Sequence, residues 1–247
     1  MASNPPARCC TVGVKHEGTP TGKMVKVDNW DAYLAVPDQP RKDVAILMLP
    51  DVIGIWQNSQ LLADQFAANG YTTMILDIYN GDALSLNRPE DFDFAAWKDK
   101  GSDGKNPHTP AAVDPIVEAA VKQLRSDHGV KRLGSIGYCF GAKYVCRHFK
   151  SGIDVGFLCH PSFVDEEELE VVGPLGIAAA ETDSIFPATK RHRSEEILKK
   201  TGQPYQISLY SGVVHGFTVR GNMANKVERF AKEAAFHQAV QWFDAWL

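Results

Sequence analysis

The chain has 247 residues, of which 44% are hydrophobic and 23% charged, and its formal net charge is −4. These values are ordinary for a globular protein, and a chain of this length buries enough apolar surface to fold without a disulfide or metal. Lys and Arg form no stripe suited to nucleic acid, and the longest apolar runs, such as Val44–Leu49, are too short to cross a bilayer.

Five cysteines are present, and they show neither the spacing of a disulfide framework nor a CxxC pair. We therefore expect no zinc site and reduced thiols, which fit a reducing compartment. The first ten residues lack the apolar stretch of a secretory signal. Together these features predict a cytoplasmic protein that binds neither nucleic acid nor membrane.

The predicted elements begin with an irregular lead-in over residues 1–22 and two short antiparallel strands, Met24–Val27 and Ala32–Val36. Val44–Leu49 is an unbroken apolar run, which is typical of a strand covered on both faces. A helix capped by Asn58 or Ser59 and stopped at Gly70 is predicted next, followed by a strand at Tyr71–Ile78 and an irregular stretch at 79–109 with a short helix near Trp97. Asp114-Pro115 opens the next predicted helix. The remaining predicted strands are Arg132–Gly137, Ile153–Cys159, Leu175–Ala180 and Gln206–Tyr210, and the remaining predicted helices are Ala142–Phe149, Ala188–Lys200 and Asn222–Leu247.

Alternation of strands and helices predicts an α/β fold, with a mostly parallel central sheet and helices on both faces. No repeat or low-complexity linker divides the chain, so we expect a single domain over residues 1–247. In such sheets the active site lies at the carboxyl ends of the strands. Residues that follow the predicted strands are therefore the first candidates for function.

Gly137 and Gly141 flank Cys139 at two residues on either side, directly after a predicted strand and before a predicted helix. This is the G-x-Nu-x-G spacing of a nucleophile elbow, with Cys in place of Ser. A strand that turns at once into a helix brings two backbones together, so a Cβ at either glycine would clash. The turn would also place Cys139 near a helix N-terminus, which favours a thiolate.

A buried structural cysteine in a glycine-containing turn is the alternative interpretation of Cys139, since free Cys often behaves as a small core residue. A dinucleotide-binding loop is excluded because the glycines do not match G-x-G-x-x-G.

A catalytic thiol needs a base, and the base needs an orienting acid. Asp183 follows the predicted strand Leu175–Ala180, and His215 follows the last predicted strand, so both lie at strand ends in the order nucleophile, acid, histidine. Glu181 competes with Asp183, which we prefer because it sits deeper in its loop. His160 also follows a strand but precedes the acid, so we expect it to be structural or part of the pocket wall.

Ser162 is a rival nucleophile on the same loop as His160, but it lacks flanking glycines. The loop after Val44–Leu49 usually supplies one oxyanion-hole N–H and the residue after the nucleophile supplies the other, which nominates the amides of Val52 and Phe140. Asp51 would then lie near Cys139, where it either poises the thiol or merely caps the next turn.

These motifs together resemble the dienelactone hydrolase (carboxymethylenebutenolidase) family of the α/β-hydrolase superfamily, and they cover nearly the whole chain. The segments that carry the resemblance, the last four of which are similar to its fungal branch, are Gly-Tyr-Cys139-Phe-Gly, Glu-Thr-Asp183-x-x-Phe-Pro, His215-Gly-Phe, Asp77–Gly81, Cys9-Cys10, His16–Gly22, Ala67–Tyr71 and Trp242–Leu247.

The resemblance implies an α/β-hydrolase fold and a Cys139–His215–Asp183 triad that opens a small lactone through an acyl-thiol intermediate, without cofactor or metal. In bacterial members a Glu poises the thiol, and Asp51 stands at the matching position here. Arg220 is the candidate for gripping a substrate carboxylate, although it lies one residue beyond the bacterial pattern. Arg88 and Lys98 both stay open as a second basic contact.

Hydrolysis of a small lactone or ester is thus the leading hypothesis, and a monomer and a homodimer are equally open. The alternative is a non-catalytic protein that retains the pocket and binds a small molecule or a partner, which the replacement at Asp51 motivates. Redox sensing by Cys139 is a third hypothesis. It lacks a resolving cysteine that the sequence can place nearby, although Cys159 is conceivable.

Overall fold

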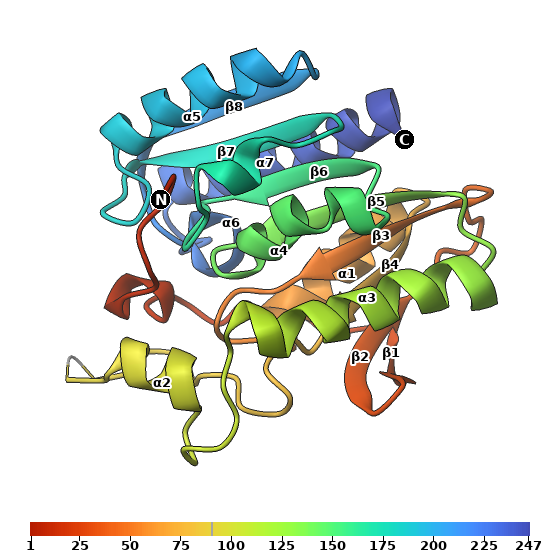
Figure 1. Cartoon of the computed structure of the whole chain (residues 1–247), viewed down its shortest axis with the longest axis horizontal. Helices are drawn as coiled ribbons and strands as arrows, with labels where there is room; N and C mark the ends of the chain where they lie inside the picture. The colour runs from red at the N-terminus through yellow and green to blue at the C-terminus, as the bar shows by residue number, and fades with distance from the viewer. Residues whose placement is uncertain (90) are drawn as a thin grey trace.

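A single eight-stranded sheet forms the centre of the computed structural model, which describes residues 1–89 and 91–247 (Figure 1). Its strand order is β1-β2-β4-β3-β5-β6-β7-β8; β2 is antiparallel to both of its neighbours, and all other neighbours are parallel. The strands are β1 (Lys23–Val27), β2 (Trp30–Ala35), β3 (Val44–Leu49), β4 (Thr72–Leu76), β5 (Arg132–Tyr138), β6 (Val155–Cys159), β7 (Leu175–Thr182) and β8 (Tyr205–Val214).

Helices cover both faces of this sheet, and each face has its own apolar cluster. One cluster takes side chains from α3, α4 and α5, and the other takes them from α1 and α7. The helices are α1 (Gln57–Ala68), α2 (Phe94–Lys100), α3 (Pro110–Asp127), α4 (Gly141–Arg147), α5 (Ala188–Thr201), α6 (Phe217–Arg220) and α7 (Lys226–Trp246), and single 3₁₀ turns are η1 (Arg8–Cys10), η2 (Phe149–Ser151) and η3 (Glu167–Leu169). The predicted α/β architecture is confirmed.

The central strand β3 shows why an unbroken apolar run was needed. Leu47 and Leu49 belong to the cluster on one face, whereas Ile46 and Met48 belong to the cluster on the other. Because successive side chains of a strand point to opposite faces, a strand covered on both faces must be apolar at every position.

Several predicted boundaries were wrong. The helix expected to open at Asp114-Pro115 begins at Pro110, so Asp114 lies inside it. There it pairs with Arg147, the last residue of α4, and with His148, which follows it. The N-cap of α1 is Trp56, and Ser59 is its third helical residue, whose hydroxyl accepts the Trp56 amide. The helix predicted to begin at Asn222 begins at Lys226 and is capped by the Asn225 side chain.

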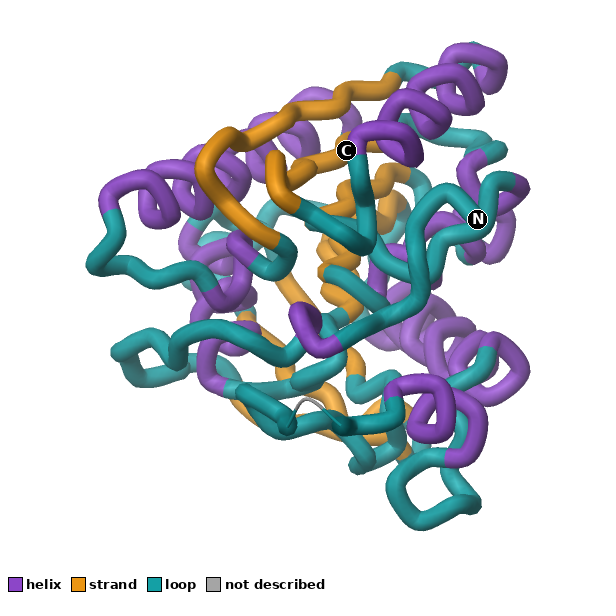
Figure 2. The backbone as a smooth tube through the Cα atoms, turned by 90° about the vertical axis from the view of Figure 1, so that its left-hand side faces the viewer, coloured by secondary structure: helices purple, strands orange, loops and turns teal. Residues whose placement is uncertain are grey.

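The N-terminal segment, residues 1–14, runs along one side of the molecule next to α6 (Figure 1). The amide of Val14 donates to the carbonyl of Arg220 at 3.0 Å. Figure 2 looks onto this side, where loops and turns cover much of the view. Among the described residues, no helix has both the length and the apolar character that a bilayer span requires.

Candidate active site

The turn between β5 and α4 holds Cys139 in the left-handed region, with φ of 51°. A Cβ on Gly137 would lie 2.6 Å from the Cα of Ala142, and one on Gly141 would meet the Leu49 carbonyl and lie 2.8 Å from the Pro50 oxygen. Only glycine fits at these two positions, as the sequence led us to expect. Backbone strain at Cys139 is typical of functional turns, where the surrounding structure enforces it.

His215 and Asp183 meet beside this turn. Nδ1 of His215 lies 2.9 Å from Oδ2 of Asp183, and both side chains are buried. The other carboxylate oxygen of Asp183 accepts the amides of Ile185 and Phe186 at 2.8 and 3.1 Å. The two amides fix the carboxylate, which in turn fixes the ring of His215, so that its Nε2 faces the thiol of Cys10.

The pKa of Cys139 and the pKa of His215 each depend on the charge of the other group. Burial alone would raise the pKa of Cys139, but a hydrogen bond from Cys10 and the positive charge of His215 hold it well below its ordinary value. Burial alone would lower the pKa of His215, but the Cys139 thiolate and the Asp183 carboxylate raise it to about 10. The two shifts favour the same state, with a thiolate on Cys139 and an imidazolium on His215.

Cys10 is the site residue that the sequence did not reveal. It is fully buried, and its Sγ lies 3.5 Å from Nε2 of His215. Donor atoms of Cys10, Cys139 and His215 all lie within 4.8 Å of one another. The only available signal was a vicinal pair of cysteines in an otherwise irregular lead-in, which gives no hint of the partner.

Long-range hydrogen bonds hold the N-terminal segment in place. The amide of Ser3 donates to the Val164 carbonyl at 3.0 Å, and the Ser3 hydroxyl accepts the Val164 amide at 2.8 Å. The amide of Asn4 donates to the Ile185 carbonyl at 2.8 Å. The segment is therefore anchored on the loops that follow β6 and β7, and its Cys10 contacts His215.

Asp51 and Arg220 form an ion pair in which each side chain is 1% exposed. Arg220 also donates to the carbonyls of Val12 and Cys9, at 3.1 and 3.3 Å. Burial and the nearby Cys139 thiolate raise the pKa of Asp51 to about 6, although Arg220 opposes them. Asp51 also accepts the amide of Ile53 at 3.1 Å, so it caps the turn as well as lying near the thiol.

The rival residues take different places. Glu181 is exposed and accepts the Gly212 amide at 2.8 Å, whereas Asp183 holds the histidine. His160 is fully buried, and its ring packs edge-on against His215 with centroids 4.9 Å apart. Ser162 is also buried, with its hydroxyl 3.4 Å from Sγ of Cys139. His160 and Ser162 therefore line the triad.

The amides of Val52 and Phe140 have no hydrogen-bond acceptor among the described residues. The other basic candidates lie against aromatic rings. The guanidinium of Arg88 is 4.8 Å from the ring centre of Phe92, and the ammonium of Lys98 is 5.4 Å from that of Phe163.

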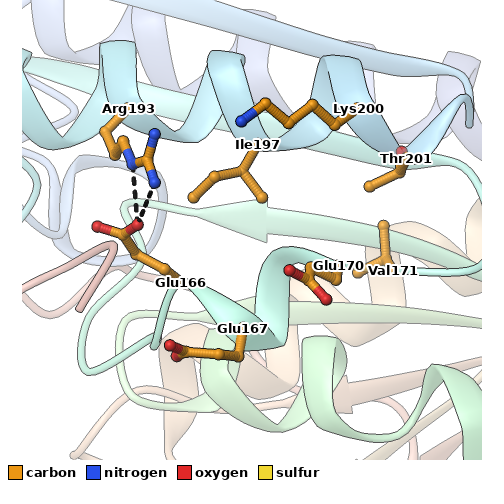
Figure 3. Close-up of a pocket in the computed structure, with 8 residues that line it drawn as sticks. All are labelled: Glu166, Glu167, Glu170, Val171, Arg193, Ile197, Lys200 and Thr201. Carbon is orange, nitrogen blue, oxygen red and sulfur yellow. Dashed lines mark hydrogen bonds and ion pairs between the residues drawn. The ribbon is translucent and has the colours of Figure 1, made fainter.

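A surface pocket of about 480 Å³ lies elsewhere, between α5 and the η3 segment (Figure 3). Arg193 of α5 pairs with Glu166 there at 2.8 Å, and charged side chains make up much of its lining. Its lining includes none of Cys139, Asp183 and His215.

Comparisons with known proteins identify the family of this chain. The chain is 48% identical to hydrolase tropI of Talaromyces stipitatus and 41% identical to hydrolase pyvD of Aspergillus violaceofuscus, over 100% of this chain and 99% of each relative. A solved dienelactone hydrolase structure from Klebsiella pneumoniae has a TM-score of 0.71 at 16% identity, covering 91% of this chain and 98% of that one. The model of the dienelactone hydrolase family matches residues 30–247. The chain therefore belongs to the dienelactone hydrolase family, as its motifs predicted.

Proposed function

We propose that this hydrolase opens a small lactone or cleaves an ester through a Cys139–His215–Asp183 triad and an acyl-thiol intermediate. One observation carries the proposal: the histidine bonded to Asp183 has its ring within 4.8 Å of a thiol held in a strained strand-to-helix turn. This combination supplies a nucleophile, a proton carrier and an orienting carboxylate in one place.

In the first half of the reaction, the Cys139 thiolate attacks the carbonyl carbon and forms a C–S bond. The carbonyl oxygen becomes an oxyanion, which the amides of Val52 and Phe140 stabilise. The C–O bond to the leaving alkoxide then breaks, and the imidazolium of His215 protonates that oxygen. The product is an acyl-thiol on Cys139 and, for a lactone, a new hydroxyl on the same molecule.

In the second half, neutral His215 takes a proton from water, and the resulting hydroxide attacks the acyl carbon. The C–S bond breaks, the carboxylic acid leaves, and the pair returns to thiolate and imidazolium. Asp183 stays ionised throughout, since its hydrogen bonds to His215 and to the Ile185 and Phe186 amides keep its pKa low despite burial. Its task is to orient the ring and to stabilise the charge on it.

We propose that Arg220 binds a carboxylate of the substrate. Its guanidinium is already paired with Asp51 and bonded to the N-terminal segment. An incoming carboxylate would therefore compete with Asp51 for Arg220. Because Cys139, Asp183 and His215 are buried and the N-terminal segment contacts His215 and Arg220, we propose that this segment moves when substrate enters.

The test is a panel of lactones, aryl esters and thioesters, assayed with the wild type, Cys139→Ala and Cys139→Ser. We expect turnover of at least one substrate by the wild type and a loss of about 10³-fold or more in Cys139→Ala, because the nucleophile is gone. Cys146→Ala is the matched control, since Cys146 is buried in α4 outside the triad. Circular dichroism checks that each variant is folded.

Undiminished turnover in folded Cys139→Ala would overturn the proposal. If the wild type turns over nothing in the panel and iodoacetamide leaves Cys139 unmodified near neutral pH, the non-catalytic binding protein is the better account. Cys9 should also react with iodoacetamide, because a hydrogen bond with Cys10 and the charge of His215 lower its pKa to about 7 against the effect of burial. Peptide mapping must therefore show which cysteine has been labelled.

A further inference from the structure

Three metal-binding side chains from distant parts of the sequence meet in the site: Cys10, Cys139 and His215. In tetrahedral zinc sites, Zn–S and Zn–N bonds of about 2.3 and 2.0 Å place sulfur about 3.5 Å from nitrogen and two sulfurs about 3.8 Å apart. Sγ of Cys10 lies 3.5 Å from Nε2 of His215, and all three donor atoms lie within 4.8 Å of one another. A small side-chain rotation therefore completes the geometry.

His215 is already oriented as a metal ligand. Its Nδ1 lies 2.9 Å from Asp183, so Nε2 is the nitrogen that faces the sulfur of Cys10, and its lone pair becomes available when a cation displaces the proton there. Metal-binding histidines almost always have such a carboxylate or carbonyl partner on the other nitrogen, because it fixes the tautomer and raises the basicity of the ligand. Asp183 would therefore act as a positioning residue for the metal site.

The charges of the cluster also balance. Two thiolates cancel the charge of a divalent cation, so the buried complex with a neutral imidazole carries no net charge. The nearby positive charge of Arg220 is offset by Asp51, its buried partner. Thiolate ligands select zinc and similar thiophilic ions over magnesium or calcium, which prefer oxygen.

We propose that Cys10, Cys139 and His215 bind one thiophilic divalent cation, with Zn²⁺ as the physiological candidate and an open fourth coordination position. Cys10 is the residue that makes this a metal site, because the other two alone offer only a pair of ligands. If the proposed hydrolysis is correct, a bound ion also inhibits it, since the ion occupies the sulfur and the nitrogen that the reaction uses.

The experiment uses the full chain, stripped of metal and kept reduced with a phosphine so that no disulfide forms. Zn²⁺ is titrated against a chromogenic chelator, and Co²⁺ is added separately as an optical probe. We expect one ion per chain, an intense thiolate-to-cobalt charge-transfer band and tetrahedral d–d bands, and no competition by excess Mg²⁺.

Variants assign the ligands. Cys10→Ala should weaken Zn²⁺ binding by about 100-fold or more, and Asp183→Asn by about 10- to 100-fold as its orienting hydrogen bond changes. Cys146→Ala removes a buried thiol elsewhere and should leave binding unchanged. Cys9→Ala tests the neighbouring thiol and should have little effect.

Three results would overturn the proposal: substoichiometric zinc binding, a cobalt complex without thiolate charge transfer, or wild-type affinity in Cys10→Ala. Equal losses in Cys9→Ala and Cys10→Ala would refute the ligand assignment. None of these measurements depends on catalysis, so they test the metal site separately from the hydrolase proposal. Inhibition by zinc that is lost in Cys10→Ala is the readout that joins the two.

Discussion

Two regions of the molecule each deliver a cysteine to the same place, and they do so by different means. The β5–α4 turn presents Cys139 through local backbone geometry, because Gly137 and Gly141 allow the strand and the helix to approach closely. The N-terminal segment presents Cys10 through hydrogen bonds to residues far along the chain, such as Val164 and Ile185. The first arrangement is encoded in ten consecutive residues, and the second in contacts across the whole fold.

The two thiols also differ in charge. The pKa of Cys139 lies well below its ordinary value because Cys10 and His215 stabilise the thiolate against the effect of burial. Burial, together with the neighbouring Cys139 thiolate to which it donates, raises the pKa of Cys10 well above its ordinary value. Residue type therefore does not decide reactivity here, and the neighbours of each sulfur do.

The largest expected effect comes from a change that should reduce the difference in pKa between Cys139 and Cys10. Asp183→Asn removes the carboxylate that stabilises the imidazolium, so the pKa of His215 should fall and that of Cys139 should rise. Turnover should drop by about 10²- to 10⁴-fold. The lowered pKa keeps Cys139 ionised to more acidic pH in the wild type than in the variant, so its alkylation should extend further into the acidic range in the wild type. A pH profile of iodoacetamide labelling, mapped by peptide, measures this; identical profiles would contradict the account.

Arg220 joins the two regions, since it pairs with Asp51 beside Cys139 and bonds to Cys9 and Val12 of the segment. Arg220→Leu leaves a buried carboxylate without its partner, which should destabilise the fold by about 3–5 kcal/mol. Thermal unfolding should show the melting temperature reduced by roughly 6–20 °C. The double variant with Asp51→Leu should recover much of this loss; a double variant no more stable than Arg220→Leu would show that the ion pair is not the cause.

Gly141→Ala tests the steric basis of the elbow. The new Cβ would meet the Leu49 and Pro50 carbonyls, which are backbone atoms and cannot move aside cheaply. We expect a destabilisation of about 2–3 kcal/mol and loss of turnover. Gly129→Ala is the control, because no atom lies near the added Cβ. Its left-handed φ alone should reduce the free energy of unfolding by about 1 kcal/mol. Equal melting temperatures for the two variants would argue against close backbone approach as the reason for Gly141.

The smallest expected effect belongs to the N-terminal segment. Ser3→Ala leaves the Val164 amide without its hydroxyl acceptor, at a cost of about 1–2 kcal/mol. Because the lost contact tethers only the segment, local opening should increase more than global unfolding. Labelling of Cys10 and Cys139 should therefore accelerate while the melting temperature changes little. The exposed Ser126→Ala serves as control; unchanged labelling in Ser3→Ala would mean that this tether does not limit access.

The sequence predicted what local rules determine. Unbroken apolar runs identified the parallel strands, and the glycines around Cys139 identified the turn. The order of Asp183 and His215 after their strands identified the residues that the structure brings together. The start of α3 was misplaced, because Pro115 and Asp114 resemble an opening turn although tertiary contacts to Arg147 keep Asp114 inside the helix.

What the sequence could not predict depends on long-range packing. The pairing of Asp51 with Arg220 joins residues separated by 169 positions, and the contact of Cys10 with His215 joins residues separated by 205. We expected no metal site because no two cysteines have ligand spacing. That expectation considered only neighbours in sequence, whereas the three donor atoms converge through the fold.

The most direct test of the central claim is to trap the acyl-thiol. The protein is mixed with an activated aryl ester, quenched in acid within the first turnover, and digested for peptide mass spectrometry. We predict that the acyl group is on the peptide containing Cys139, and that the adduct disappears on a longer incubation as water releases it. An acyl group on Ser162, Cys9 or Cys10 with Cys139 unmodified would contradict the account.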